Sequence, residues 1–244
     1  MKLEGKCAVV TGAGSGIGRA IAHCFALEGA HVTAVGRNAG KLEQTREQAG
    51  EASSRIFPHA ADVADRAGVE KLIESVEKKI GPVDILVNNA GVNVPRRTMA
   101  DVSAEDFEKM VRINLTGAFH CIQAVLPGMR ARGGGLIINV SSIAGVRASV
   151  LAGAGYSASK FGLSALSLTT GMEEGENGIR SCLICPGEVN TPLIDDRLVV
   201  PSAEKRAVML QPEDLAQAAL LIATLHPRAT IPEMIITPTN YRFC

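Results

Sequence analysis

A tyrosine and a lysine four positions apart form the most reactive pair of side chains in the sequence. Tyr156 and Lys160 follow a loop rich in Gly and Ala, and they open a stretch with helical apolar spacing. On a helix they share one face. A neighbouring cation favours the phenolate and lowers the pKa of a tyrosine, which makes it a usable acid and base near neutral pH. A surface tyrosine and a solvated lysine can have the same spacing, so the pair alone leaves both interpretations open.

The residues just before this pair end a buried strand. The apolar run 136–140 is typical of such a strand, and Ser141 and Ser142 follow it directly. The stretch 136–168 therefore holds a strand, two serines, a loop and the Tyr156 helix in succession. Further along, Asn114 is a polar residue in an apolar helical stretch, where core packing and function are equally compatible with its spacing.

A glycine-rich turn near the N-terminus indicates a phosphate-binding element. The apolar run 6–11 predicts a strand, Gly12, Gly14, Gly16 and Gly18 follow, and a helical pattern begins at Arg19. Strand, turn and helix in this order are the context of a dinucleotide site, because glycine lets the backbone approach a pyrophosphate and the helix N-terminus favours an anion. The alternative is a plain flexible loop.

The end of the next strand indicates which dinucleotide would bind. The run 31–36 predicts a strand, and Arg37 and Asn38 follow without an acidic residue. An acidic residue at this point suits the ribose 2′-hydroxyl of NAD, whereas an arginine suits a 2′-phosphate. The sequence therefore favours NADP(H) over NAD(H), unless Arg37 is an ordinary exposed residue.

Composition excludes several other classes of function. The chain has 244 residues, no net charge at pH 7 and no apolar run long enough for a membrane span, which argues against nucleic-acid and membrane partners. Its six cysteines show no disulfide framework, and Cys182 and Cys185 would point to opposite faces of one strand. We expect no metal site, and we expect the protein to work in a reducing, cytoplasmic setting.

Strands and helices alternate along the whole chain. This order predicts one α/β domain over residues 1–244, a doubly wound, Rossmann-type, mostly parallel seven-stranded sheet with helices on both faces. A loop over about 188–211 should border the substrate. The predicted strands are 6–11, 31–36, 55–60, 83–87, 136–140, 180–185 and 233–237, and the predicted helices include 41–51, 65–80, one from Ser103 towards Met129, and 213–225 after Pro212.

Several of these segments together resemble the short-chain dehydrogenase/reductase family. The resemblance runs from Leu3 to about Pro192. It rests on the segments 11–18, Asp62-Val63, 88–91, Asn114, Ser142, 156–160, and Pro186-Gly187 with Thr191.

The resemblance implies a Ser-Tyr-Lys-Asn site that interconverts a secondary alcohol and a carbonyl by hydride transfer. Tyr156 would be the acid and base, Lys160 would lower its pKa and hold the nicotinamide ribose, Ser142 would bind the substrate carbonyl, and Asn114 would hold a relay water. The residues implied in cofactor binding are Gly12, Ser15, Gly16, Ile17, Gly18, Arg37, Asp62, Val63, Asn88, Ala90, Gly91, Tyr156, Lys160, Pro186, Gly187, Val189 and Thr191. Members commonly form homotetramers or homodimers.

Departures from the family pattern bear on the substrate. The loop between Ser142 and Tyr156 carries an extra residue and contains Arg147, and the segment 231–239 is similar to the tail of 3-hydroxy acid and serine dehydrogenases. Arginine matches carboxylates bidentately. We therefore expect a small 3-hydroxy or 3-oxo acid that Arg147 helps to bind, while Arg96 and Arg97 lie near the site entrance. The alternatives are a 3-oxoacyl-thioester reductase of the fatty-acid type and a non-catalytic NADP(H)-binding sensor.

Overall fold

A computed structural model, which describes residues 1–241, shows a single sheet of seven parallel strands. The strand order across the sheet is β3-β2-β1-β4-β5-β6-β7, and every neighbouring pair is parallel. The predicted fold class is confirmed, and the sheet is entirely rather than mostly parallel. The strands are β1 (Cys7–Thr11), β2 (His31–Gly36), β3 (Ile56–Ala60), β4 (Ile85–Asn88), β5 (Gly135–Val140), β6 (Ile179–Pro186) and β7 (Glu233–Ile236).

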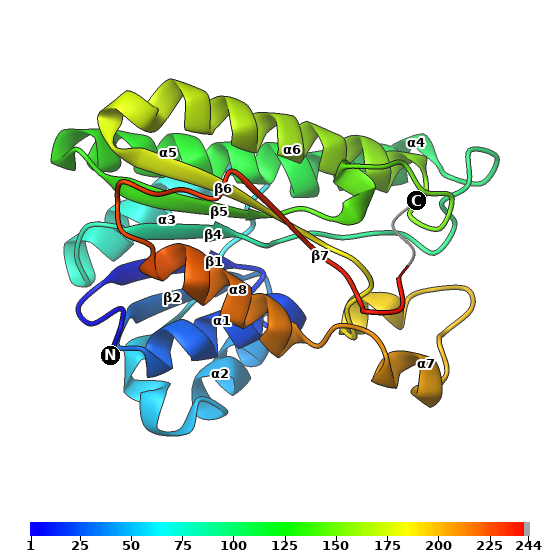
Figure 1. Ribbon diagram of the computed structural model, residues 1–244, viewed down its shortest axis with the longest axis horizontal. Coiled ribbons are helices and arrows are strands. Elements are labelled where there is room, and N and C mark those ends of the chain that lie inside the picture. Colours follow the sequence, from blue (N-terminus) through cyan, green and yellow to red (C-terminus); the bar gives the residue numbers. More distant parts are fainter. Residues whose placement is uncertain (242–244) are drawn as a thin grey trace.

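Helices cover both faces of the sheet, as Figure 1 shows. One face is covered by α1, α2 and α8, and the other by α3, α5 and α6, with α4 beside α6. The helices are α1 (Gly16–Leu27), α2 (Ala39–Glu47), α3 (Arg66–Lys79), α4 (Ala104–Val111), α5 (Gly117–Arg132), α6 (Ala154–Glu174), α7 (Ala203–Ala207) and α8 (Pro212–Thr224).

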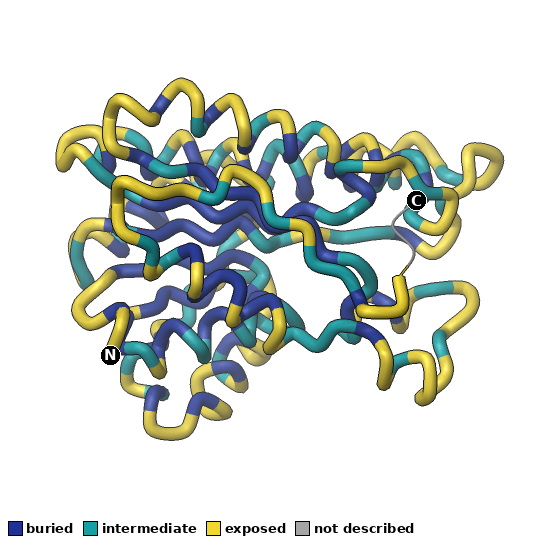
Figure 2. Tube along the Cα trace, in the orientation of Figure 1, coloured by how far each residue is buried: buried dark blue, intermediate teal, exposed yellow. Residues whose placement is uncertain are grey.

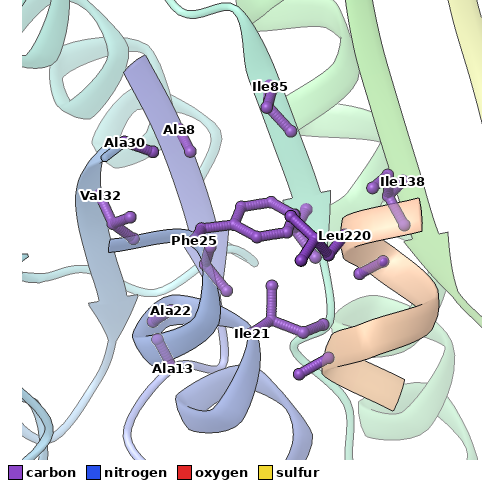
Figure 3. Packing of buried hydrophobic residues seen from close by; sticks show 14 of the residues in the cluster. Ala8, Ala13, Ile21, Ala22, Phe25, Ala30, Val32, Ile85, Ile138 and Leu220 are labelled. Carbon is purple, nitrogen blue, oxygen red and sulfur yellow. The ribbon is translucent and has the colours of Figure 1, made fainter. Parts of the chain in front are cut away.

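The core consists of two apolar layers on either side of the buried strands (Figure 2). In one layer Ile21 and Phe25 of α1 pack with Leu220 of α8 against the sheet (Figure 3). In the other layer Leu72 of α3 packs with Met129 of α5. Burial of a single such side chain contributes roughly 1.5–3 kcal/mol, so both layers hold the helices firmly on the sheet.

Two predicted helices end differently from the expectation. The predicted helix 41–51 ends at Glu47, because Gly50 adopts φ +57° and a 3₁₀ turn, Gly50–Arg55, follows. The helix predicted from Ser103 towards Met129 is divided into α4 and α5 by a π-helical turn, Arg112–Thr116. Single π turns inside helices are frequent at functional sites, and this one contains Asn114.

The strand order reverses at β1, which has β2 on one side and β4 on the other. In open parallel sheets, ligands bind at such a switch point beyond the carboxyl ends of the strands. The segment 188–211 lies at this end of the sheet and includes α7 (Figure 1). Its base is closed where Asn190 N donates to the Leu210 carbonyl and Leu210 N donates to that of Glu188.

Candidate functional site

A cavity of about 570 Å³ lies at the carboxyl ends of the strands. Its walls come from the ends of β1 to β6 and from the segment 188–211. Most residues that the sequence implicated border this cavity. They are Gly12, Ser15, Gly16, Ile17, Arg37, Asp62, Val63, Ala90, Gly91, Ser142, Tyr156, Lys160, Pro186, Gly187, Val189 and Thr191.

The glycine turn leaves the backbone bare at one end of the cavity. Gly12 has φ +65°, and a Cβ there would lie 2.9 Å from the Ala90 Cα, so a larger residue would be both strained and too close. Ser15 is the N-cap of α1 but, within the described chain, forms no side-chain cap, and the first turn has no acidic residue. The helix N-terminus is therefore suited to an anion such as a pyrophosphate.

Side chains beneath the turn hold it in place. The Thr45 hydroxyl lies 2.9 Å from the Ala13 carbonyl and accepts a 3.1 Å hydrogen bond from Arg19 Nε. Arg19 also donates to the Gly14 carbonyl. The turn is thus fixed before any ligand binds, which reduces the entropic cost of binding.

Two basic residues line the cavity beyond β2. Arg37 follows the strand directly, and Lys41 lies in the first turn of α2, where its backbone N–H donates to Asn38 Oδ1 at 3.0 Å. Neither side chain has a carboxylate within ion-pair distance in residues 1–241. Two cations without a carboxylate partner suit an anion such as a phosphate group. The sequence analysis missed Lys41, although its place four residues after Arg37 was visible.

Two predicted cofactor residues do not border the cavity. Asn88 is buried, and its side chain donates to Asn139 Oδ1 at 2.9 Å in the sheet interior. The next residue, Asn89, borders the cavity instead and donates to the Thr11 carbonyl at 3.0 Å. Gly18 lies behind the turn, where a Cβ would collide with the carbonyl oxygen of Gly12. Gly18 therefore supports the turn through close packing.

The phenol of Tyr156 lies beside the hydroxyl of Ser142. The two side chains are hydrogen-bonded, and this bond lowers the pKa of Tyr156, as do the nearby charges of Arg197 and Arg97. Burial has the larger, opposite effect, so the pKa is raised to about 12. This differs from the sequence expectation of a lowered pKa, because desolvation of the phenolate outweighs the neighbouring donors and cations.

Lys160 is buried one helical turn after Tyr156. Its Nζ atom donates to the Val140 carbonyl at the end of β5 at 2.8 Å and lies 5.7 Å from the centroid of the Tyr156 ring. Burial lowers the pKa of Lys160 to about 8, against a small raising effect of Cys185. The ammonium is therefore close to its own titration point at neutral pH.

Asn114 ties the π turn to the strand ends. Its Oδ1 accepts from Val92 N at 2.8 Å, and its Nδ2 donates to the Val92 carbonyl at 2.9 Å and to Ser159 Oγ at 3.0 Å. A Cβ on Gly91 would lie 3.5 Å from Asn114 Oδ1 and 3.6 Å from Lys160 Nζ. Asn114 is fully buried and does not border the cavity itself. Its hydrogen bonds hold the loop of Gly91 and Val92, which does.

Thr191 and Gly187 form the opposite wall of the cavity. A Cβ on Gly16 would lie 3.1 Å from Thr191 Cγ2, so this wall closes directly over the glycine turn. Gly187 N donates to the Ile236 carbonyl at 2.7 Å, which fixes the wall to β7.

Of the three arginines that the sequence placed near the substrate, Arg97 lines the cavity, whereas Arg96 and Arg147 do not. Arg147 is exposed and does not line the cavity, because its backbone N–H donates to the Ile143 carbonyl in a turn that leads away from β5. The cavity is bordered instead by Arg97 and Arg197. Arg96 is exposed outside it. The expectation for Arg147 is therefore corrected: a position in the loop between Ser142 and Tyr156 does not ensure a position in the cavity.

Residues 1–241 contain neither a candidate metal site nor a candidate membrane span. No group of three or more His, Cys, Asp or Glu side chains is arranged to hold a metal ion. In the same residues, no helix has the length and apolar character that a membrane span requires.

Comparison with known proteins gives consistent matches. Residues 6–198 match the family model described as short chain dehydrogenase. Glycine betaine reductase ATRR of Emericella nidulans is 36% identical over 244 residues, which cover 98% of this chain but only 19% of that longer protein. D-beta-hydroxybutyrate dehydrogenase of Rhizobium meliloti is 37% identical over 195 residues, 79% of this chain and 75% of that one. The 3-oxoacyl-[acyl-carrier-protein] reductase FabG of Thermotoga maritima is 32% identical over 232 residues, 92% of each chain.

Solved structures agree with these relatives. The closed form of a serine dehydrogenase complexed with NADP+ has a TM-score of 0.88 and 30% identity, covering 97% of this chain and 96% of that one. The family model, the relatives and the fold agree, and together they show that this chain is an oxidoreductase that belongs to the short-chain dehydrogenase family.

Proposed function

We propose that the protein is an NADP(H)-dependent oxidoreductase that interconverts a carbonyl and a secondary alcohol, with Tyr156 as its acid and base. One observation carries the proposal. The Tyr156 phenol is hydrogen-bonded to Ser142 and lies one turn from the buried Lys160, in the same cavity as the glycine turn of β1 and α1. A proton donor and a turn suited to a dinucleotide therefore border the same cavity.

The residues present suit a phosphorylated dinucleotide. The bare turn at Gly12 and the start of α1 would hold the pyrophosphate, and Arg37 with Lys41 would hold the 2′-phosphate. Asp62 and Val63 would border the adenine. When bound in its reduced form, the nicotinamide would supply the hydride for the carbonyl carbon.

The chain's own groups would stabilise and protonate the carbonyl oxygen. The Ser142 hydroxyl and the Tyr156 Oη would donate to this oxygen as negative charge develops on it, which stabilises the transition state more than the ground state. Tyr156 would then release its proton to that oxygen, which completes the alcohol. The raised pKa of Tyr156, about 12, keeps this proton in place until the oxygen becomes basic enough to take it.

The phenolate left by this transfer needs compensating charge. The ammonium of Lys160, whose Nζ atom lies 5.7 Å from the ring centroid, would supply this charge. Asn114 would support this end of the site through the loop of Gly91 and Val92, and its family role as holder of a relay water remains part of the proposal.

We propose a small 3-hydroxy or 3-oxo acid as the substrate. The hydroxybutyrate dehydrogenase relative and the serine dehydrogenase neighbour both have names that indicate a hydroxy acid. The second candidate is a 3-oxoacyl thioester, which the FabG relative favours. Leu151 and Leu193 line the cavity and are exposed, so they would give a longer acyl chain apolar contacts.

Assembly into a homodimer or homotetramer is also proposed. Phe161, Leu168 and Met172 lie seven and four residues apart on α6 and are all exposed, so they form one apolar stripe. Sedimentation velocity at several protein concentrations tests this proposal, and a monomer throughout would contradict it.

An absorbance screen tests the proposed reaction. Purified protein would be mixed with NADPH or NADH and a panel of ketones, 3-oxo acids and thioesters, while fluorescence titration measures cofactor binding separately. Oxidation of NADPH by at least one carbonyl is the expected result. NADPH binding without turnover of any carbonyl would instead support a cofactor-sensing protein.

A further inference from the structure

Two guanidinium groups reach the proposed substrate end of the cavity from different loops. Arg97 lies between β4 and α4, and Arg197 lies in the segment 188–211. Both side chains act electrostatically on the phenol of Tyr156. The proposed reacting oxygen would therefore lie beside two positive charges that the proton transfer from Tyr156 does not itself require.

The two arginines differ in how their charges are balanced. Arg197 Nη1 lies 2.7 Å from Glu188 Oε1, and the exposed fractions of the two side chains are only 14% and 23%. Arg97 has no ion pair or side-chain hydrogen bond with any residue in 1–241. Its pKa is lowered by burial and by the repulsion of Arg197. An uncompensated, partly desolvated cation in a cavity is a ready partner for an anion.

The backbone of Arg97 is held by the loop that leads to Tyr156. Gly153 is the N-cap of α6 with φ +82°, and a Cβ there would lie 2.6 Å from the Arg97 carbonyl oxygen. The Asn93 side chain also donates to the Ala152 carbonyl at 3.1 Å, which ties the two loops together. The backbone of Arg97 thus lies directly against the loop that leads to Tyr156, and Arg97 is only partly exposed, whereas its sequence neighbour Arg96 is exposed.

We propose that Arg97, with Arg197 beside it, binds a carboxylate of the substrate and determines the preference for acids over neutral carbonyl compounds. The proposal rests on the proposed function, since it places the substrate at Tyr156. A guanidinium offers a planar fork that matches the two oxygens of a carboxylate. Glu188 neutralises one of the two arginines, so one net positive charge remains for one carboxylate.

The test compares Arg97→Gln with the matched control Arg96→Gln. For each protein, kcat/KM is measured with a short 3-oxo acid and with its methyl ester, and NADPH binding is measured by fluorescence. In Arg97→Gln, the acid should lose about 10–100-fold in kcat/KM, mainly through KM, because hydrogen bonds to a charged group are lost. The ester, the NADPH affinity and all values of the control should stay within about 3-fold of wild type.

Several results would overturn the proposal. One is an unchanged ratio of kcat/KM for the acid to kcat/KM for the ester in Arg97→Gln, and another is an equal loss of kcat/KM for the acid in the Arg96→Gln control. A preference of the wild type for the ester or for a long thioester would also contradict the proposal. A matching loss of NADPH affinity in Arg97→Gln would place Arg97 in the cofactor site instead. If Arg97→Gln does not fold, Arg97→Lys keeps the charge without the fork, and the acid should still lose more than the ester.

A binding measurement separates this proposal from the proposed reaction. Calorimetry on the NADP+-loaded protein compares the binding of butyrate with that of butyramide. Neither compound has a ketone or aldehyde group that could be reduced. Tighter binding of butyrate that disappears in Arg97→Gln would support the carboxylate subsite even if no carbonyl compound is turned over. Equal binding of the two compounds, or no binding of butyrate, would overturn it.

Discussion

The Nζ atom of Lys160 lies 5.7 Å from the ring centroid of Tyr156 while it donates a 2.8 Å hydrogen bond to the backbone carbonyl of Val140. The ammonium is therefore held at the end of β5 by this hydrogen bond, close to the phenol. Because it is buried there, its pKa falls to about 8. The charge that would stabilise the Tyr156 phenolate is thus itself sensitive to pH near neutrality.

The rate of carbonyl reduction should fall as this charge is lost. Below a pH of about 8, Lys160 is protonated and can stabilise the phenolate, and above it the amine is neutral. We expect kcat/KM for reduction to be level at lower pH and to decrease through about 8. A pH profile with saturating NADPH checks this. A profile that stays level up to a pH of about 10 would contradict the assigned role of Lys160.

Lys160→Met should remove activity without loss of stability at neutral pH. The ordinary pKa of lysine is 10.5, against about 8 in the folded protein, so burial of the ammonium costs roughly 3 kcal/mol at pH ~7, partly offset by the Val140 hydrogen bond. The unfolded chain binds the proton more tightly between these two pKa values, so wild-type stability should rise with pH across that window. In urea unfolding at pH ~7 and ~10, the free energy of unfolding of the variant should exceed that of the wild type only at the lower pH. A variant less stable by several kcal/mol at pH ~7 would contradict this account.

The two serines after β5 should have separable roles. Ser142 is hydrogen-bonded to Tyr156, whereas Ser141 is buried and its hydroxyl lies 3.1 Å from the Lys160 carbonyl and 3.2 Å from Ser164 Oγ. Ser142→Ala should lower kcat by about 10²–10³-fold and lower the free energy of unfolding by about 1 kcal/mol, because the Ser142 hydroxyl also accepts a hydrogen bond from Ala144 N. Ser141→Ala should instead cost roughly 1–2 kcal/mol of stability. Steady-state kinetics and urea unfolding of both variants check the assignment, which equal effects on kcat would refute.

Replacement of Arg37 should change the cofactor preference. Arg37 and Lys41 are the basic residues beside the expected 2′-phosphate, so Arg37→Asp should weaken NADPH binding by about 10–100-fold and leave NADH binding nearly unchanged. Fluorescence titrations with both cofactors measure this, and Arg228→Asp, an exposed site outside the cavity, is the matched control. Equal affinity of the wild type for the two cofactors would show that Arg37 is an ordinary surface residue.

The sheet could be predicted from the sequence because each strand is a short apolar run between turn signals. The predicted run 31–36 agrees with β2, and Pro212 begins α8 as expected from its preference for the first helical position. The π turn could not be predicted, since its residues, 112–116, continue an apolar helical pattern. Within this turn, the side chain of Asn114 bonds both backbone groups of Val92, a tertiary contact that no local pattern reveals.

In the candidate site too, residues in a local sequence pattern could be predicted, whereas residues that the tertiary fold brings to the cavity could not. Tyr156, Lys160 and the glycine turn have local patterns with a chemical meaning, so they could be singled out. Arg97 could be placed near the site entrance because it follows the turn 88–91. Arg147 was nevertheless favoured as the substrate residue and Arg197 was not singled out, because the folding of two loops decides which arginine borders the cavity. Asn88 was favoured over Asn89 for a similar reason, since the sequence does not show that the Asn88 side chain is buried against Asn139 of the neighbouring strand.

The central claim is that Tyr156 supplies the proton to the carbonyl oxygen, and Tyr156→Phe tests it most directly. This variant keeps the ring and removes only the hydroxyl that is bonded to Ser142. NADPH binding, followed by fluorescence, and turnover of the best substrate from the screen are measured on the same preparation. The account predicts an NADPH dissociation constant within about 3-fold of wild type and a kcat lower by at least about 10³-fold, because the phenol acts in the chemical step. A kcat close to that of wild type, with NADPH still bound, would contradict the account.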